Sequence, residues 1–246
     1  MITILSILFT PDENNYNRFE TSFKSIISSD LTNVDKIIID GWCPSDDIWN
    51  NIILLINDNN KITLVRRTIN IGKSTIVNDN IANITTSMTQ YILLLDSDII
   101  LQQDTISRLS LLSSYSDIII PNQLQDCRHY KLFFKNPTSY NDELIYKITQ
   151  PLGLAGGCIF ASTNVLKDIT FKNKGSYGSD DVDFFERAID KYNLILCENI
   201  NVTHPFDTNK EYYEWKLSTS LSSFHKELSQ EDIDVKIKES HMFWKI

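Results

Sequence analysis

Five short apolar runs, separated by four segments with helical periodicity, constrain the fold of this chain more than any other feature. The runs are ITILSIL, DKIIID, KITLV, YILLL and DIIIP, and the segments between them predict helices at 17–27, 46–56, 73–85 and 104–112. Because the runs are apolar at nearly every position, we expect strands that are buried on both faces. The alternation predicts an α/β fold, a Rossmann-like and mostly parallel sheet flanked by helices. Such sheets bind ligands beyond the carboxyl ends of their strands.

The pattern loosens beyond Pro121. Residues 123–146 are polar and aromatic, and they fit either irregular chain or a small antiparallel addition. A Gly-rich strand, GLAGGCIFAS, an acidic segment, YGSDDVDFFERAIDKY, and a strand, LILCENINVTHP, follow before a polar and aromatic tail. No repeat or linker interrupts the 246 residues, so we expect one domain over 1–246, with halves at 1–121 and 122–205 and a helical tail at 206–246.

Composition narrows the class of protein. The net charge of −9 disfavours a broad nucleic-acid surface, although it leaves room for a local basic groove. The four cysteines form no C-x-x-C pair, which predicts buried reduced thiols at Cys43, Cys127, Cys158 and Cys197. The apolar N-terminus lacks a basic region and a cleavage site, and no apolar run is long enough to span a bilayer. We therefore expect a cytoplasmic protein without a membrane span, and the many asparagines suggest an AT-rich genome.

Asp96 and Asp98, in YILLLDSDII, stand at the carboxyl end of the fourth run. In an extended chain, residues two apart project from the same face, and two such charges about 4 Å apart repel by roughly 4 kcal/mol at an effective dielectric of 20. A divalent cation shared with the phosphates of a nucleotide would relieve this repulsion, because Mg²⁺ and Mn²⁺ take oxygen ligands. The alternative is that Asp98 or its neighbour only caps the helix that follows.

The other strand ends also carry polar residues. They are Thr10 with Pro11, Asp40 with Gly41, and Arg66 with Arg67. The segment NIGKS that follows is not a Walker A loop, because Arg67 stands where that loop needs its first glycine. Lys73 could still meet a phosphate near the start of its helix. The absence of G-x-G-x-x-G after the first strand counts against a dinucleotide-binding fold.

A second acidic cluster, SDDVD, allows two interpretations. Ser179 could be a helix N-cap with Asp180 and Asp181 in the first turn, where the helix dipole favours negative charge. A carboxylate after the Gly-flanked segment GSYG could instead face a substrate hydroxyl as a general base. Asp183 and Arg187 are four residues apart and are expected to pair on the helix surface. Three neighbours are expected in the core: Phe184, Phe185 and Ala188.

His204 follows NVT at the end of the last predicted strand, where a proline stops the pairing. Its imidazole could complete a metal site begun by Asp98. Taken alone, it would be a hydrogen-bonded histidine of the core or surface. The other three histidines, His129, His225 and His241, form no cluster in the sequence.

In their order, these segments resemble the GT-A-type nucleotide-sugar glycosyltransferases, particularly the large inverting family that includes bacterial and viral sugar transferases. ILLLDSDI is similar to the D-x-D strand of that family, IIIDGWCPSDD to its second-strand aspartate and Ser/Asp turn, and NIGKSTIVNDNIA to its G-K…N helix. GLAGGCIFAS resembles its Gly-rich acceptor-side strand, YGSDDVDFFERA its acidic pair, and VTHP its late metal histidine. The resemblance covers 2–205 and implies a GT-A-like fold with a small acceptor-side subregion.

The resemblance implies that the chain binds a nucleotide-sugar donor. The implied donor-binding residues lie at the strand ends and in the helix after the third strand: Thr10, Pro11, Asp40, Arg66, Arg67, Gly72, Lys73, Asn78, Asp96 and Ser97. Asp40 would read the base of the donor. Arg66 or Arg67, together with Lys73, would lie near the diphosphate. Asp96 would touch the ribose or the metal.

The same resemblance implies Mn²⁺ or Mg²⁺ as the cofactor, held by Asp96, Asp98 and His204. Asp181 would take the proton from the acceptor hydroxyl as it attacks the anomeric carbon, and the metal would stabilise the departing diphosphate. The implied acceptor-binding residues are Gly156, Gly157, Tyr177 and Asp180. The two glycines would let the sugar approach the backbone closely.

The sequence departs from the family pattern in ways that bear on the substrate. The acidic pair is Asp-Asp, so its first carboxylate has a shorter reach than the usual glutamate. The Q/R-x-x-R-W segment of processive polysaccharide synthases is not visible, and no membrane helix follows, which favours transfer of a single hexosyl or pentosyl unit. Inversion is implied by the resemblance alone.

Two other functions stay open. A haloacid-dehalogenase-type phosphatase also has a strand ending in D-x-D, with a nucleophilic first aspartate, but its motif lies near the start of the domain, and Ile100 stands where that family has Thr or Val. A degenerate transferase domain would only bind a nucleotide or glycan. The acceptor is open among a glycan, a protein, a small molecule and a modified nucleobase in DNA. Aromatic residues of the tail could line its groove or pack the last helices: Tyr212, Tyr213, Trp215, Phe243 and Trp244.

Overall fold

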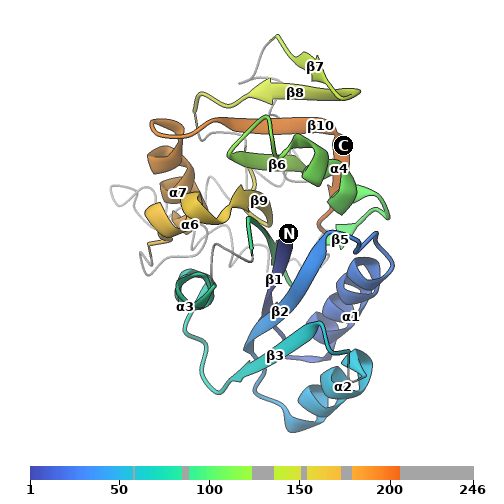
Figure 1. The fold of residues 1–246 in the computed structure, drawn as a ribbon. Helices are drawn as coiled ribbons and strands as arrows, with labels where there is room; N and C mark the ends of the chain where they lie inside the picture. The colour runs from blue at the N-terminus through green and yellow to red at the C-terminus, as the bar shows by residue number, and fades with distance from the viewer. Residues whose placement is uncertain (58, 85–88, 124–135, 151–153, 173–178, 206–246) are drawn as a thin grey trace, which may run out of the picture.

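The computed structural model describes residues 1–57, 59–84, 89–123, 136–150, 154–172 and 179–205 (Figure 1). Several expectations from the sequence lie outside these residues. They concern the end of the third predicted helix, Cys127, the histidines other than His204, Tyr177 and the tail at 206–246.

One mixed sheet forms the centre of the described structure (Figure 1). Its strands are β1 (Ile2–Phe9), β2 (Val34–Trp42), β3 (Ile62–Arg67), β4 (Tyr91–Asp96), β5 (Ile100–Leu101), β6 (Ile118–Gln123), β7 (Thr138–Tyr140), β8 (Glu143–Lys147), β9 (Cys158–Ser162) and β10 (Leu194–Thr203). In space their order is β3-β2-β1-β4-β9-β6-β10-β8-β7, and β5 pairs with β10 outside this path. β3, β2, β1 and β4 are parallel, and β6 is parallel to β10. The expected mostly parallel α/β sheet is confirmed.

Helices cover both faces of this sheet (Figure 1). On one face lie α1 (Glu13–Ile27), α2 (Asp46–Ile56) and α4 (Thr105–Leu112), whose apolar residues join one hydrophobic cluster with the sheet. On the other lie α3 (Lys73–Asn83), α6 (Thr163–Asp168) and α7 (Ser179–Ile189), which join a second cluster. Burial of apolar surface on both faces explains why the strand sequences are apolar throughout rather than alternating.

Local capping explains where the first two helices begin. α2 has the bounds expected from its sequence, and Ser45 Oγ accepts a hydrogen bond from the Ile48 amide at 3.3 Å. α1 begins at Glu13, earlier than the expected residue 17, because Asp12 Oδ1 accepts from the Asn15 amide at 2.9 Å and caps the helix there.

The second half of the chain was less well predicted from its sequence. The antiparallel addition within 123–146 is present as the hairpin of β7 and β8. The Gly-rich strand is present as β9, but it runs antiparallel between β4 and β6. β5 and α6 were not expected. The predicted ion pair of Asp183 and Arg187 forms at 2.6 Å, although Asp183 is buried rather than at the helix surface. The three expected core residues of α7 are buried: Phe184, Phe185 and Ala188.

Cys43, Cys158 and Cys197 are buried free thiols, as expected. Within the described part of the chain, none of the helices combines the length and the apolar character that crossing a bilayer requires.

Candidate active site

β4 directs the side chain of Asp96 toward the face of the sheet that α3, α6 and α7 cover. Successive residues of a strand alternate between faces, and Ile92 and Leu94 pack in the cluster under these helices. Asp96 continues the alternation at the end of the strand, where its amide donates to the Gly157 carbonyl oxygen at 2.8 Å. The strand therefore fixes the first carboxylate of the D-x-D segment, whereas Asp98 lies in the turn that follows.

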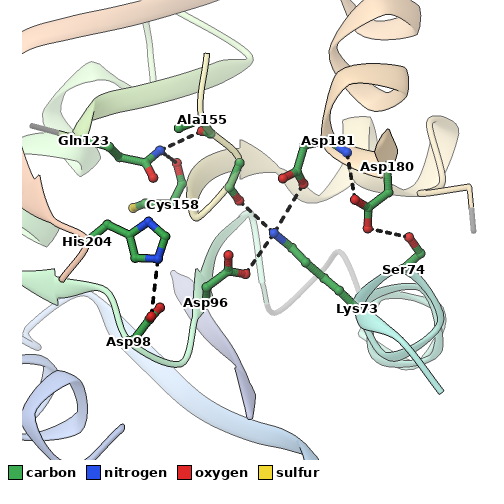
Figure 2. Close-up of polar contacts among 11 residues, drawn as sticks. Lys73, Ser74, Asp96, Asp98, Gln123, Ala155, Cys158, Asp180, Asp181 and His204 are labelled. Carbon is green, nitrogen blue, oxygen red and sulfur yellow. Dashed lines mark hydrogen bonds and ion pairs between the residues drawn. The ribbon is translucent and has the colours of Figure 1, made fainter. Parts of the chain in front are cut away.

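Lys73, the first residue of α3, lies between the carboxylates of Asp96 and Asp181 (Figure 2). Gly72 precedes it with φ 80°, a backbone conformation that favours glycine. Lys73 Nζ lies 2.9 Å from Asp96 Oδ1, donates to the Gly156 carbonyl oxygen at 2.9 Å, and lies 3.3 Å from Asp181 Oδ1. One ammonium group thus connects α3, β4, the segment before β9 and α7. We call Lys73, Asp96, Gly156 and Asp181 the lysine cluster.

A second contact joins the first turns of α3 and α7. Ser74 Oγ donates to Asp180 Oδ2 at 2.8 Å, and the Asp181 amide donates to Asp180 Oδ1 at 3.2 Å (Figure 2). Both aspartates lie in the first turn of α7, where the helix dipole favours negative charge. Asp180, expected to contact the acceptor, thus has a partner in α3, and its acceptor contact stays a prediction.

Burial of the lysine cluster changes the acidity of its groups. Removal from water raises the pKa of Asp181 to about 6; the charge of Lys73 opposes this shift, and the charges of Asp180 and Asp96 add to it. Burial alone would lower the pKa of Lys73, but Asp181, Asp96 and Asp180 together raise it above its ordinary value, so the amine stays protonated.

One oxygen of Asp181 has no hydrogen-bond donor among the described residues. Asp181 Oδ1 is buried, and Lys73 Nζ lies 3.3 Å from it as an ion pair. The two charges attract each other, but the oxygen keeps a free lone pair. A buried carboxylate oxygen with a raised pKa and a free lone pair has the properties of a general base.

The two predicted acceptor-side glycines pack against polar side chains. A Cβ on Gly156 would lie 1.9 Å from Asp181 Cγ, so the carboxylate of Asp181 fills the space that a side chain would need. A Cβ on Gly157 would lie 2.9 Å from Gln123 Oε1 and 3.4 Å from Asp96 Oδ2. The glycines therefore let Asp181 and Gln123 approach the backbone; the approach of a sugar there stays a prediction.

Strand pairing brings His204 to Asp98. β5 follows the D-x-D turn and pairs with β10, which places Ile100 opposite Thr203, the residue before His204. His204 Nε2 lies 3.3 Å from Asp98 Oδ2 (Figure 2). Arg18 of α1 lies near the same oxygen, with Nη1 3.9 Å from Asp98 Oδ2.

The Asp98–His204 pair fits a divalent cation. Two neighbouring ligands of an octahedral ion with bonds of about 2.1 Å lie about 3 Å apart, close to the 3.3 Å between these atoms. Carboxylate oxygen suits Mn²⁺ and Mg²⁺, and neutral imidazole is a common metal ligand. Among the described residues, no group of three or more His, Cys, Asp or Glu side chains could hold a metal ion, and Asp96 Oδ1 contacts Lys73 instead. A cation here would have Asp98 and His204 as ligands from the described residues and could take others from water or phosphate oxygens, as nucleotide-bound Mg²⁺ usually does.

Asp40 lies in a buried network beside α3. Arg67 Nε and Nη2 donate to its two oxygens at 2.7 Å each, and Asn80 Nδ2 donates to Oδ2 at 2.7 Å. The Asp40 side chain is 1% exposed, so its contact with a donor base stays a prediction. Arg66 instead pairs with Asp46 at the start of α2. Of the two arginines, Arg67 is therefore the one on the α3 side of the sheet.

Thr10 has a buried hydroxyl that is suited to a ligand. Its amide donates to the Trp42 carbonyl oxygen at 3.1 Å, which fixes it just beyond β1. Thr10 Oγ1 is buried and has no hydrogen-bond partner within the described part of the chain. Pro11 follows it, and Ser97 follows the adjacent strand β4. An unsatisfied buried hydroxyl is costly, so a polar ligand at this edge would stabilise it.

Asn78 faces a structural partner rather than the lysine cluster. Its Nδ2 donates to the Phe171 carbonyl oxygen at 2.7 Å, and its Oδ1 accepts from the Phe171 amide at 2.9 Å. These bonds use both polar groups of the side chain and explain Asn78 without a donor contact, which stays a prediction.

Three residues of the site were missed by the sequence reasoning. Ser74 and Arg18 lie in helices, and nothing in their local sequence indicates which face they occupy. Gln123 could have been found, because it ends β6 at the ligand-binding edge of the sheet. Its Nε2 donates to the Ala155 carbonyl oxygen at 2.6 Å, which holds the segment before Gly156 and Gly157 in place (Figure 2).

Known proteins resemble this chain in structure but not in sequence. No protein-family model matches the chain, and no curated protein does. The mannosyltransferase PcManGT from Pyrobaculum calidifontis, solved with GDP-Man and Mn²⁺, superposes with a TM-score of 0.67 at 14% identity, over 92% of this chain and 63% of that one. TarS 1–349 of S. aureus gives 0.59 at 14%, over 95% and 68%. GalNAc-T7, solved with UDP, GalNAc and Mn²⁺, gives 0.60 at 11%, over 98% and 54%.

The fold is of the GT-A type. This confirms the fold that the order of motifs implied. The chain spans less than two thirds of the length of the mannosyltransferase and of GalNAc-T7. Sequence identities of 11–14% show a shared fold and nothing more. The chemistry therefore has to be argued from the residues of this chain.

Proposed function

We propose that this protein is a divalent-metal-dependent glycosyltransferase that moves one sugar from a nucleotide-sugar to an acceptor hydroxyl with inversion. The observation that carries the proposal is that Asp181 and the Asp98–His204 pair lie at one edge of a GT-A sheet (Figure 2). Asp181 Oδ1 supplies a buried carboxylate oxygen with a free lone pair, and Asp98 and His204 supply two ligands at metal-like spacing. Solved neighbours with Mn²⁺ and a sugar nucleotide or nucleotide support the same donor class.

The donor would bind across the ends of β1, β2 and β4. The buried hydroxyl of Thr10 would form a hydrogen bond with the nucleotide. Arg67 would place a positive charge beside Asp40. When bound, Mn²⁺ or Mg²⁺ on Asp98 and His204 would supply charge that stabilises the departing diphosphate. Arg18, close to Asp98, would add further positive charge there.

Asp181 would act on the acceptor. Its Oδ1 would accept the proton of the acceptor hydroxyl while the hydroxyl oxygen forms a bond to the anomeric carbon. The bond from that carbon to the diphosphate breaks, and its electron pair leaves with the diphosphate. A single displacement of this kind inverts the anomeric centre. Asp96 would not serve as a nucleophile, because its Oδ1 is paired with Lys73.

The two alternative functions are less consistent with these contacts. In the phosphatase, the first aspartate of D-x-D attacks phosphorus, whereas the GT-A fold and the Asp98–His204 pair favour a nucleotide-bound metal. In a domain that only binds a ligand, a buried carboxylate oxygen with no hydrogen-bond donor in the described part of the chain would have no use and would cost stability.

A thermal-shift screen of nucleotide-sugars with and without Mn²⁺, followed by turnover of the donor that stabilises the protein, tests the proposal. We expect the melting temperature to rise most when donor and Mn²⁺ are both present. Asp181→Asn should then lower kcat by a factor of about 10³ with little change in donor binding. Glu186→Gln, an exposed carboxylate of the same helix, is the matched control and should retain activity. Phosphatase turnover that is indifferent to nucleotide-sugars would refute the proposal.

A further inference from the structure

We propose that Lys73 is a positioning residue for the base Asp181 and does not bind the donor diphosphate. This inference rests on the proposed function and assigns the lysine a different role from the one that its place near the start of a helix suggests. Three observations carry it: the oxygen atoms that surround its ammonium group, the contact of Asp181 with Gly156, and the hydrogen bond between Ser74 and Asp180 that joins α3 to α7.

Three oxygen atoms of the described residues surround the ammonium group of Lys73. An ammonium has three N–H donors. Two are directed at Asp96 Oδ1 and the Gly156 carbonyl oxygen, each at 2.9 Å, and the third side faces Asp181 Oδ1 at 3.3 Å. A phosphate contact would require Lys73 to leave at least one of these oxygens. Since two of these oxygens belong to aspartates, a shift of the ammonium group toward a phosphate would weaken its attraction to Asp96 or Asp181.

Lys73 and Gly156 both contact the carboxylate of Asp181. Lys73 donates to the Gly156 carbonyl oxygen, while the carboxylate of Asp181 lies against the Cα of the same glycine, where a Cβ would approach Cγ to 1.9 Å. Lys73 therefore contacts both the backbone beside Asp181 and the carboxylate of Asp181 itself. Removing its amine would free the carboxylate to rotate and would leave Asp96 and Asp181 without the cation between them.

The start of α7 has a second anchor that does not involve Lys73. Ser74 Oγ donates to Asp180 Oδ2 at 2.8 Å, and this contact would persist in a Lys73 variant. The helix should thus stay docked on α3 when the amine is removed. A Lys73 variant is therefore expected to fold and to bind donor with a misplaced base.

The first experiment separates binding from turnover in Lys73→Met, which keeps the length of the side chain. Calorimetric titrations use Mn²⁺ with UDP and Mn²⁺ with GDP, and kinetics use the donor found for the wild type. We expect the nucleotide Kd and the donor KM to change less than about threefold while kcat falls about 10²-fold or more, because the lost contacts belong to the base. A Kd raised tenfold or more, with kcat little changed, would show a phosphate ligand and overturn the inference. Lys167→Met is the matched control, since Lys167 Nζ also donates to a backbone carbonyl, that of Ile84, at 2.6 Å.

The second experiment needs no turnover and no ligand. Melting temperatures of the wild type, Lys73→Met, Asp181→Asn and the double variant form a cycle. We expect Lys73→Met to lower the melting temperature by several degrees in the wild type and by less than half as much in Asp181→Asn, where one of the two repelling charges is gone. Equal shifts in both backgrounds would show that the two side chains are not coupled and would overturn the inference. If the wild type transfers no sugar, the proposed function fails, and this cycle still decides whether Lys73 holds Asp181.

Discussion

The lysine cluster and the Asp98–His204 pair differ in how their charges are balanced, although both begin at the same D-x-D segment. In the lysine cluster, a protein cation lies between two carboxylates and within 3.3 Å of both. In the pair, the carboxylate has an imidazole at 3.3 Å and a guanidinium only at 3.9 Å. Asp96 is thus paired with a cation of the chain, whereas the proposed function has Asp98 share a metal ion with His204. The comparison suggests that two aspartates two residues apart can serve a base and a metal separately.

Removing a ligand of the pair should have the largest effect. Asp98→Asn or His204→Ala leaves one good ligand, and we expect the affinity for Mn²⁺ to fall at least tenfold and turnover to fall by about 10² to 10³. Metal titration by calorimetry in the presence of UDP or GDP, with turnover measured at saturating Mn²⁺, gives both quantities. Asp104→Asn, in an exposed aspartate that pairs with Arg108, is the control. Full turnover of either variant without added metal would show that Asp98 and His204 do not hold a metal ion that the reaction requires.

A methyl group at Gly156 should disturb the lysine cluster and leave the pair intact. Its Cβ would lie 1.9 Å from Asp181 Cγ, so the carboxylate has to move. We expect Gly156→Ala to lower kcat by about 10²-fold and to leave the Mn²⁺ affinity unchanged within about threefold, since a displacement of about 1 Å costs this much. Gly41→Ala provides the contrast, because its Cβ would lie 1.9 Å from the Leu8 carbonyl oxygen in the sheet and should destabilise the fold. Weaker Mn²⁺ binding in Gly156→Ala would show that the lysine cluster and the Asp98–His204 pair are coupled, which contradicts their separate roles.

The acidity of Asp181 should appear as a smaller, pH-dependent effect on stability in the metal-free protein. Its folded pKa of about 6 is higher than the unfolded value near 4, so this group favours folding most below about pH 4 and loses that contribution as the pH rises through 6. The unfolding free energy of Asp181→Asn relative to the wild type should therefore increase by about 1 kcal/mol from pH 5 to pH 8.

Urea unfolding at each pH measures this difference, and Glu186→Gln gives the baseline for removing a carboxylate from α7. A difference that shrinks as the pH rises would mean that Lys73 lowers the pKa of Asp181 more strongly than burial raises it.

The fold of the first half could be predicted from the sequence because its signals are local. The apolar runs, the cap at Ser45 and the helix at 46–56 depend on neighbours within a few residues. The antiparallel course of β9 and the short strand β5 could not be predicted in the same way, because they depend on pairing with β4, β6 and β10. Local patterns do not contain such long-range contacts.

The candidate site shows the same limit at the level of single residues. The rule that ligands bind at the carboxyl ends of strands pointed to Asp96, Asp98 and His204 as candidates. It would also have pointed to Gln123 if the predicted strand DIIIP had been extended past Pro121 to the end of β6. It could not predict that Lys73 lies between Asp96 and Asp181, because the sequence gives the spacing of residues and not the geometry between α3 and α7. Nor could it show that the carboxylate of Asp181 fills the space beside Gly156.

We propose two separate roles at this edge of the sheet: Asp98 and His204 bind a metal ion, and Lys73 holds the base Asp181. Anomalous diffraction from a crystal soaked with Mn²⁺ and a nucleoside diphosphate tests this proposal most directly. We expect one manganese peak bonded to Asp98 and His204, with Lys73 still between Asp96 and Asp181. A peak bonded to Asp96 and Asp181, with Lys73 displaced toward the diphosphate, would contradict it.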